Sequence, residues 1–329
     1  MPIPAVKRLV DGSQPPPRPG PPQRVHWQHT YASITGSNGE GEEIPLTGYS
    51  GNRWPAIFMQ DGATGLDTPP YELHADDSPN LDGGLFRGVR ATQREIMIPV
   101  YIYGIDRRTL LEQKRELARA LNPKNGYCVL KFTESDGQAR YLNAYYKGGM
   151  EGNESSDQSG FRWIKYALLL TAYDPWFYSD EMRVAKWSFG QGVPFLGRPF
   201  LPLRLSEGYK SAVTLPVYNP GDVEAWPVWE ISGPVKSFRI TSQTGQKFGI
   251  PSATSGGDVI ALGRTLRIDT RPGVKTLKDD RGTNYYPDME ADPKLWSIPS
   301  GDSTMTVDVV AGSGQATVTL TFKPRYDSY

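Results

Sequence analysis

The chain has 329 residues, enough for two domains that each bury a core, and its 35 glycines and 29 prolines indicate many turns and short strands. Basic and acidic side chains both number 36, so the formal charge is zero, which argues against a nucleic-acid-binding protein. The single cysteine, Cys128, excludes an intramolecular disulfide and a multi-cysteine metal site, and its apolar neighbours predict a buried structural thiol.

Residues 1–24 are a proline-rich arm with four basic side chains and one acid. Pro15-Pro16-Pro17 and Pro21-Pro22 favour polyproline II, which exposes its backbone and needs no core. Two interpretations stay open, a solvated arm and a strap that orders on a neighbouring subunit, and we favour the arm. No apolar stretch typical of a signal peptide is evident, and the longest aliphatic run, residues 167–170, is too short to cross a bilayer. We therefore expect no membrane insertion.

Residues 25–180 are predicted to form one α+β domain, in which a helix packs on a mainly antiparallel sheet. Short strand-like segments, such as 25–27 and 57–59, alternate with glycine turns, and Pro69-Pro70 leads into an extended segment. The strand over residues 92–103 has two apolar faces, one of isoleucines and a valine and the other with Met97, Pro99, Tyr101 and Tyr103. We expect cover on both sides and, at Pro99, a sheet edge or a bulge.

One helix is predicted between Asp106, its N-cap, and a stop at Asn122-Pro123. Its apolar stripe consists of Leu110, Leu117, Ala118 and Leu121. Lys114 projects near the centre of this stripe, where a charge needs an explanation. It is a candidate contact to an acid across a subunit interface, although a lysine that reaches solvent within its own subunit is the favoured interpretation.

After the helix, residues 127–133 and 138–146 are predicted to form a hairpin around Glu134-Ser135-Asp136-Gly137, with the glycine where positive φ is favoured. A further strand is predicted over residues 161–173. Residues 181–212, which glycines and prolines punctuate, are expected to be a linker or transition segment.

Residues 213–329 are predicted to form an all-β sandwich, because strand-like segments recur at roughly 8–12 residues and alternate with turn sequences. The expected strands span residues 213–218, 226–232, 237–241, 259–262, 265–269, 304–310 and 316–322. No helix is expected in this domain.

The motifs that could carry chemistry are weak. His26 and His29 have i, i+3 spacing but no cysteine or acidic partner beside them, so a structural role is favoured over a metal site. Asp76, Asp77 and Asp82 lack the ligand spacing of a calcium-binding loop, so a solvated loop is favoured. The sequence contains neither a nucleophile elbow nor a P-loop, and nothing singles out one pair among its 36 acids. We expect no enzyme, no metal and no cofactor.

Five aromatic residues of the second domain are candidates for stacking on sugar rings: Trp226, Trp229, Tyr285, Tyr286 and Trp296. Aromatic side chains of a sandwich more often belong to its core or to a subunit contact. Carbohydrate or host-receptor binding through this domain is therefore the alternative hypothesis, and a cell-wall hydrolase is a third, for which no residue can be nominated.

The order of features across residues 50–329 resembles the distal tail proteins of siphophages, the long-tailed, non-contractile bacteriophages. In the first domain the resemblance rests on Gly62-Ala63-Thr64-Gly65-Leu66, Pro69-Pro70-Tyr71-Glu72-Leu73, Leu85-Phe86-Arg87-Gly88-Val89-Arg90, the strand from Arg94, the helix, Tyr146-Lys147-Gly148-Gly149-Met150 and Asp174-Pro175-Trp176. In the second it rests on Asn219-Pro220-Gly221-Asp222, Ala225-Trp226-Pro227-Val228, Ile231-Ser232-Gly233-Pro234, Trp296-Ser297-Ile298-Pro299 and Lys323-Pro324-Arg325-Tyr326. The arm 1–24 lies outside this pattern.

The resemblance implies a ring-forming N-terminal domain that continues the tail tube as a hexamer, and a galectin-like sandwich outside the ring. It implies a structural virion component of the tail tip, assembled in the host cytoplasm, that joins the tube to the baseplate hub and anchors host-recognition fibres. The implied partners are further copies of the chain as a homohexamer, the tail tube protein, the hub or tail-associated protein, the tape measure protein and a receptor-binding tail fibre. No catalytic residues are implied. Lys114, Pro99, Tyr101 and Tyr103 become candidates for the subunit interface.

Overall fold

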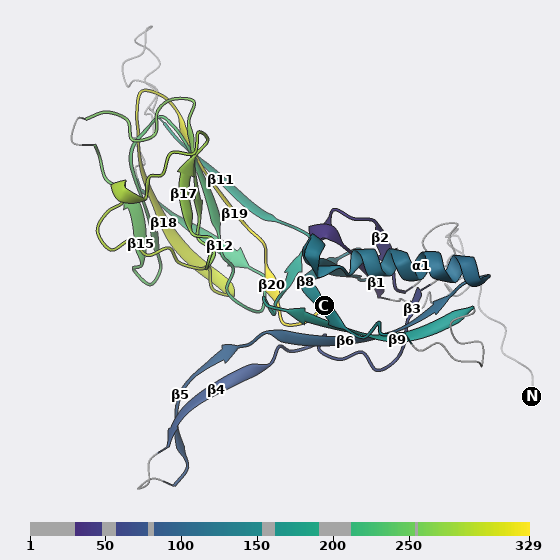
Figure 1. Ribbon diagram of the computed structural model, residues 1–329. Coiled ribbons are helices and arrows are strands. Elements are labelled where there is room, and N and C mark those ends of the chain that lie inside the picture. The colour runs from purple at the N-terminus through teal and green to yellow at the C-terminus, as the bar shows by residue number, and fades with distance from the viewer. Residues whose placement is uncertain (1–29, 48–56, 78–81, 153–161, 191–211, 254–255) are drawn as a thin grey trace, which may run out of the picture.

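The computed structural model describes residues 30–47, 57–77, 82–152, 162–190, 212–253 and 256–329. They form two domains, each around its own core of buried apolar side chains, and a hairpin that leaves the first domain (Figure 1). The expected strand at 25–27, with His26 and His29, lies outside the described residues.

The first domain is built on an antiparallel sheet in the order β2-β1-β7-β8-β9-β6-β3. Its strands are β1 (Tyr31–Thr35), β2 (Glu43–Pro45), β3 (Ile57–Met59), β6 (Arg94–Tyr103), β7 (Cys128–Thr133), β8 (Ala139–Gly148) and β9 (Trp163–Ala172). β8 pairs with β7 through residues 139–144 and with β9 through residues 145–148, so the sheet folds over along β8. Its two halves share one core, to which Leu142 and Leu168 contribute fully buried side chains.

Helix α1 (Arg107–Ala120) lies over this sheet (Figure 1). Its ends are as predicted, because the Asp106 carboxylate accepts a hydrogen bond from the Thr109 amide at 2.7 Å and a 3₁₀ turn, η2 (Pro123–Asn125), follows. Leu110, Leu117 and Leu121 are buried in the core. Ala118, expected on the same stripe, is exposed, since it lies on the outer border of that leucine line.

The predicted hairpin after the helix is confirmed in β7 and β8. Its turn is closed by a hydrogen bond from the Glu134 amide to the Gln138 carbonyl, and Gly137 has the expected positive φ of 89°. The Asp136 carboxylate accepts from the Gln138 amide, as aspartate does in such turns.

Pro99 lies at a local sheet edge. β6 pairs with β9 along its whole length, but on its other side the short strand β3 ends with Met59 opposite Val100. The Pro99 carbonyl accepts from the Gln60 amide, so the proline nitrogen faces the same side, just beyond the end of β3. A residue without an amide hydrogen is tolerated there because no strand needs that donor.

The second domain is an all-β sandwich of two antiparallel sheets, ordered β11-β19-β13-β16-β17 and β12-β18-β14-β15. The strands are β11 (Arg183–Phe189), β12 (Ala212–Asn219), β13 (Val228–Ser232), β14 (Val235–Ser242), β15 (Lys247–Ile250), β16 (Thr265–Asp269), β17 (Thr276–Asp279), β18 (Gly301–Ala311) and β19 (Ala316–Phe322). Fully buried side chains from both sheets, such as Ile231 and Val307, meet in one core.

Three strands of this sandwich differ from the expectation. β11 lies in the predicted transition segment and pairs with β19, with Trp187 on the core side and Val184 exposed. Glycines and prolines beyond its end hid this alternation. β15 and β17 have four residues each, too few for a visible period. Conversely, the segment 259–262 makes only isolated bridges, from Ile260 and Leu262.

The end of the chain returns to the first domain. The short strand β10 (Phe177–Ser179) pairs with β8 on one side and with β20 (Arg325–Tyr326) on the other. The guanidinium of the fully buried Arg94 donates to the carbonyl of Asp327 at 2.7 Å, and that of Arg140 to the carbonyl of Ser328 at 2.8 Å. The last residues therefore tie the sandwich to the first domain.

Candidate functional site: a projecting hairpin and an interdomain cleft

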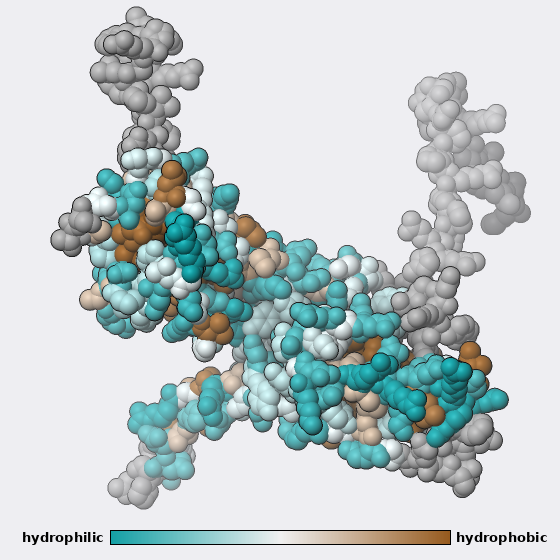
Figure 2. Space-filling model, turned by 45° about the horizontal axis from the view of Figure 1, so that its top comes forward, coloured by the Kyte–Doolittle hydropathy of each residue, from teal (hydrophilic) through white to brown (hydrophobic). Residues whose placement is uncertain are grey.

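A two-stranded hairpin projects from the first domain, away from both cores (Figures 1 and 2). It consists of β4 (Tyr71–Asp77) and β5 (Gly84–Ala91), paired antiparallel. Every residue of β4 is exposed. Asp76 and Asp77, expected in a solvated loop, are strand residues here, because β5 supplies a partner along the whole of β4.

The hairpin has one apolar face. The register places Leu73 opposite Val89 and Ala75 opposite Phe86, and residues directly opposite each other share a face. Leu73, Phe86 and Val89 are 69%, 62% and 53% exposed. Large apolar side chains gathered on one face and left in solvent mark a surface that another molecule covers.

The opposite face carries two ion pairs beside the exposed Leu85. Arg90 pairs with Glu72 at 2.6 Å, and Arg87, at the bulge in β5, pairs with Asp76 at 2.6 Å. The hydrogen bond from Arg90 lowers the pKa of the Glu72 carboxyl. Exposed ion pairs of this kind contribute about 0.2–1 kcal/mol each, and an isolated two-stranded hairpin is marginally stable in water. The hairpin therefore needs cover on its apolar face.

The three interface candidates on β6 lie together on the outer face of the sheet, opposite the core. The Tyr101 ring stands between Trp163, at 5.9 Å between centroids, and Phe58, at 6.5 Å. Burial among these rings raises the pKa of Tyr101, whereas Tyr103 remains 43% exposed and Pro99 is half-buried. This outer face is a second apolar surface on the first domain.

Lys114, the fourth candidate, is on the core side of the same sheet. It is half-buried, and its Nζ lies 6.0 Å from the centroid of Tyr166, a residue of β9 that is 6% exposed. The ammonium therefore meets an aromatic face within its own subunit. The structure brings Pro99, Tyr101 and Tyr103 together and separates Lys114 from them.

The five aromatic candidates of the second domain do not form a platform. Trp229 and Trp296 are 0% and 5% exposed and meet edge to face in the core, at 6.2 Å between ring centroids. They cannot stack on a sugar at the surface, so that expectation is wrong for both. Tyr285 is half-buried and donates to Asp279, Tyr286 is 49% exposed, and Trp226 faces the other domain.

A cleft of about 1100 Å³ separates the two domains. From the first domain, β7, β8 and the segment 173–182 line it, and from the second, the start of β13, the loop after β16 and the end of β19. Five of its side chains are tyrosines or tryptophan: Tyr127, Tyr141, Tyr173, Tyr178 and Trp226. No motif in the sequence pointed to this cleft, because its walls come from separate segments of the two domains.

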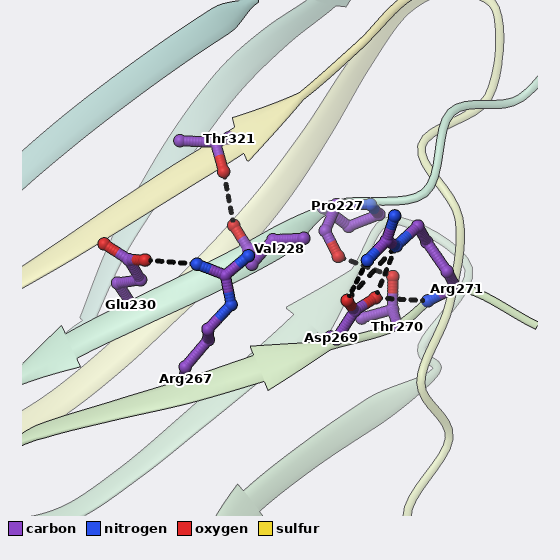
Figure 3. Close-up of polar contacts among 8 residues, drawn as sticks. All are labelled: Pro227, Val228, Glu230, Arg267, Asp269, Thr270, Arg271 and Thr321. Atoms are coloured by element: carbon purple, nitrogen blue, oxygen red, sulfur yellow. Dashed lines mark hydrogen bonds and ion pairs between the residues drawn. The ribbon is translucent and has the colours of Figure 1, made fainter. Parts of the chain in front are cut away.

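Two arginine–carboxylate ion pairs lie in the second-domain wall of the cleft (Figure 3). Arg267 donates to Glu230 at 2.8 Å, and Arg271 donates hydrogen bonds to both carboxylate oxygens of Asp269. Burial by itself raises the pKa of Asp269, but the guanidinium of Arg271 outweighs it, and the pKa lies below its ordinary value. The arginines of this wall are therefore already neutralised by acids of their own domain.

The first-domain wall carries stacked aromatic rings and the carboxylate of Asp174. Tyr141 and Tyr178 stack at 5.8 Å, and Lys323 donates to the Tyr141 hydroxyl at 2.6 Å. Tyr178 donates to Asp174, and burial together with that carboxylate raises the pKa of Tyr178. Such a surface offers aromatic faces, hydroxyl donors and carboxylates to a ligand.

The candidate chemistry stays sparse. Burial raises the pKa of the Cys128 thiol to about 12, so it is the buried structural thiol that the sequence predicts. Among the described residues, no three His, Cys, Asp or Glu side chains gather in a way that could hold a metal ion. Within the same residues, no helix has the length and hydropathy of a membrane span.

Comparison with known proteins identifies the fold. Residues 61–162, which contain the projecting hairpin, β6, α1, β7 and β8, match the family model of the phage tail protein RIFT-related domain. The chain also matches the crystal structure of the Dit protein of phage SPP1, with a TM-score of 0.55 and 14% identity, over 89% of this chain and 98% of that one. This is the fold of a phage distal tail protein. The SPP1 protein is described as a paradigm of the hub adsorption apparatus in phages that infect Gram-positive hosts.

Two structures of the phage P2 baseplate in its activated conformation are similar as well. The one with Ca has a TM-score of 0.50 and 10% identity and the one with Sr 0.51 and 11%, each over 92% of this chain and all of the matched chain. A comparison with curated protein sequences gives no match. The resemblance predicted from the sequence and the mainly β fold class are confirmed.

Proposed function

We propose that this chain is a structural component of a siphophage tail tip, in which its copies assemble into a hexameric ring. The family domain in residues 61–162 and the distal tail protein fold support this role.

The observation that carries the proposal is the uncovered apolar face of the projecting hairpin. Burial of a side chain such as Leu73, Val89 or Phe86 contributes about 1.5–3 kcal/mol, and here that free energy is not realised within the described residues of one subunit. A neighbouring copy that covers this face supplies it. The outer face around Tyr101 is a second surface on which a copy can pack.

The arrangement favours a ring. The hairpin and the outer face of β6 are different patches, so contact between them is head-to-tail and repeats from copy to copy. Such a contact closes into a ring when the rotation between neighbouring copies is a whole-number fraction of a full turn.

In the tail tip, the ring would join the tail tube protein to the baseplate hub or tail-associated protein and would contact the tape measure protein. The second domain, which we propose to be galectin-like, would lie outside the ring and anchor a receptor-binding fibre. Its position as a separate lobe, well away from the hairpin, supports this division of roles (Figure 2). Assembly would take place in the host cytoplasm.

The test compares the assembly of the full chain with that of the double variant Leu73→Ser, Phe86→Ser. Light scattering after size exclusion should give the mass of six subunits for the unchanged chain, and negative-stain electron microscopy should show rings. The double variant should be monomeric at concentrations where the unchanged chain is assembled. Leu262→Ser is the matched control, because Leu262 is 74% exposed on the second domain, and it should assemble normally.

Two outcomes would contradict the proposal. One is a monomer at every protein and salt concentration. The other is a double variant that assembles as well as Leu262→Ser, which would show that the hairpin's apolar face is not the contact.

The alternative, carbohydrate binding through the second domain, loses support from its own candidates. Trp229 and Trp296 belong to the core. Trp226 lines the interdomain cleft, whereas Tyr286 is 49% exposed and does not line it. A glycan array probed with the full chain tests this alternative, and a flat response leaves the structural role.

A further inference from the structure

Two features remain outside the proposed ring function. One is the interdomain cleft, with six aromatic side chains along its walls. The other is the proline-rich arm at the start of the chain. The chemistry of the cleft matches the chemistry of the arm.

We propose that the interdomain cleft binds residues 15–24 of the proline-rich arm of the same chain, in a polyproline II conformation. The inference does not rest on ring assembly, because both the arm and the cleft belong to a single subunit.

Aromatic grooves are the recognised partners of proline-rich segments. Proline rings pack flat on tyrosine and tryptophan, and the extended backbone leaves its carbonyls free to accept hydrogen bonds from tyrosine hydroxyls and indole N–H groups. In the cleft, Tyr173 is 68% exposed and Trp226 is half-buried, so both present ring surface to a ligand. Tyr127 and Tyr141 bring further rings to the same cleft.

The prolines of the arm have the spacing that an aromatic groove can bind. Polyproline II has three residues per turn, so Pro16, Pro19 and Pro22 align along one edge. Arg18 and Arg24 align along a neighbouring edge. A segment of this kind offers a continuous proline edge to aromatic rings and basic groups beside it.

The cleft lining mixes basic and acidic side chains, and one of its carboxylates can accept a basic group. Arg267 and Arg271 are already paired with Glu230 and Asp269 of their own domain. On the first-domain wall, Asp174 meets no basic side chain among the described residues, and its carboxylate accepts only from Tyr178 there. Arg18 or Arg24 of a docked arm has a carboxylate available.

The chain can reach the cleft from its own start. Thr30 precedes β1 and donates to Glu134, and three residues further Ser33 pairs with Lys131, which lines the cleft. Pro22 is eight residues before Thr30, and eight extended residues span roughly 26 Å. That length is enough for the arm to turn back along the wall formed by β1 and β7.

The experiment measures how fast trypsin cleaves the full chain after Arg24, with cleavage after Arg8 as a reference within the same arm. Because proteolysis follows the population of the open form, an arm docked for about nine-tenths of the time is cut about tenfold more slowly after Arg24. We expect the Trp226→Ala, Tyr173→Ala double variant to abolish this protection. Tyr286→Ala, at an exposed aromatic that does not line the cleft, should leave it unchanged.

Two sets of proline substitutions separate edge recognition from a general loss of stiffness. Replacing Pro16, Pro19 and Pro22 by alanine should abolish the protection, whereas replacing Pro15, Pro17 and Pro21 removes as many prolines and should retain most of it. Equal cleavage rates after Arg8 and Arg24, or protection that the cleft variants do not change, would overturn the proposal. Protection that rises with protein concentration would also overturn it, in favour of an arm supplied by a neighbouring copy.

Discussion

The projecting hairpin and the C-terminal tail are both thin, extended segments rich in aromatic and apolar side chains, yet they have opposite surroundings. The tail, residues 325–329, is held by contacts from the first domain: the guanidinium of Arg140 lies 3.7 Å from the centroid of Tyr326, and Tyr329 stacks on Phe132 at 4.4 Å. The hairpin has a longer strand ladder than β20, but its apolar face has no such cover. Strand pairing alone therefore does not place a segment in a core.

The difference shows where each segment gets its stability. The tail is stabilised within one chain, by groups brought from residues 94–140. The hairpin, on our proposal, is stabilised between chains. Substitutions in the two segments should therefore separate subunit stability from assembly.

The largest expected loss of stability comes from Phe177, and Phe86 on the hairpin provides the contrast. Phe177→Ala removes a ring that is 0% exposed and packs edge to face on Phe132 and Tyr329, and it should lower the free energy of unfolding by about 3–5 kcal/mol. Phe86→Ala, on the hairpin, should lower it by less than about 0.5 kcal/mol in the monomer. Urea unfolding of both variants checks the contrast, and equal losses would show that the hairpin is covered within its own subunit.

A pair of arginines gives the next contrast. The guanidinium of Arg94 donates to the carbonyls of Gly65, Asp67 and Asp327, so Arg94→Met leaves three acceptors without a donor and should cost about 3 kcal/mol. Arg90→Met breaks only an exposed ion pair on the hairpin and should cost less than about 1 kcal/mol. Chemical unfolding at neutral pH measures both. A loss at Arg94 no larger than that at Arg90 would mean that the tail is not clamped by this residue.

The pH dependence should follow the same division. The pKa of Asp269 and that of Glu72 are both lowered in the folded chain, so each pair contributes stability above the ordinary carboxyl pKa, near 3.9 and 4.3, and loses it as the pH falls through the lower folded value. Asp269→Asn should therefore destabilise the chain at pH 7. The difference in free energy of unfolding between this variant and the unchanged chain should shrink below about pH 3.9. Glu72→Gln should change little at either pH, because its pair is exposed. Unfolding curves at pH 7 and pH 3 compare them.

Lys114 is expected to give the smallest effect. Lys114→Met keeps the aliphatic stem and loses the contact of the ammonium with Tyr166, a change worth about 0.5–1 kcal/mol. Assembly, measured by light scattering, should stay intact. Weakened assembly with unchanged subunit stability would instead assign Lys114 to the subunit interface.

Much of the fold could be predicted from the sequence where the signal is local. The helix cap at Asp106, the stop at Pro123 and the turn at Gly137 each depend on residues within a few positions of one another. The two apolar faces of β6 and most strands of the sandwich could be predicted for the same reason, because a period of two is visible in a short segment. β11 was missed because turn residues beyond its end obscured its alternation.

The candidate surfaces could be predicted only in part. Pro99, Tyr101 and Tyr103 were found on one face because strand alternation places them there. Whether an aromatic side chain is exposed was not predictable, which is why the sequence leaves Trp229 and Trp296 as candidates for either sugar stacking or the core, and the structure places them in the core. The amphipathic character of the hairpin depends on the register between β4 and β5, with its bulge at Arg87, and so did not emerge from either segment alone.

The sequence by itself determined the helix, most of the strands and their order, the absence of an intramolecular disulfide and the resemblance to distal tail proteins. Only the tertiary structure decided which apolar faces are covered. Arg94 and Asp327, for example, are 233 residues apart in the chain and in contact in the fold. Local patterns reflect the free energy of a few neighbouring residues. Whether an apolar face is covered depends instead on contacts between segments that are distant in the chain. The C-terminal tail has such contacts, and the apolar face of the hairpin has none like them among the described residues.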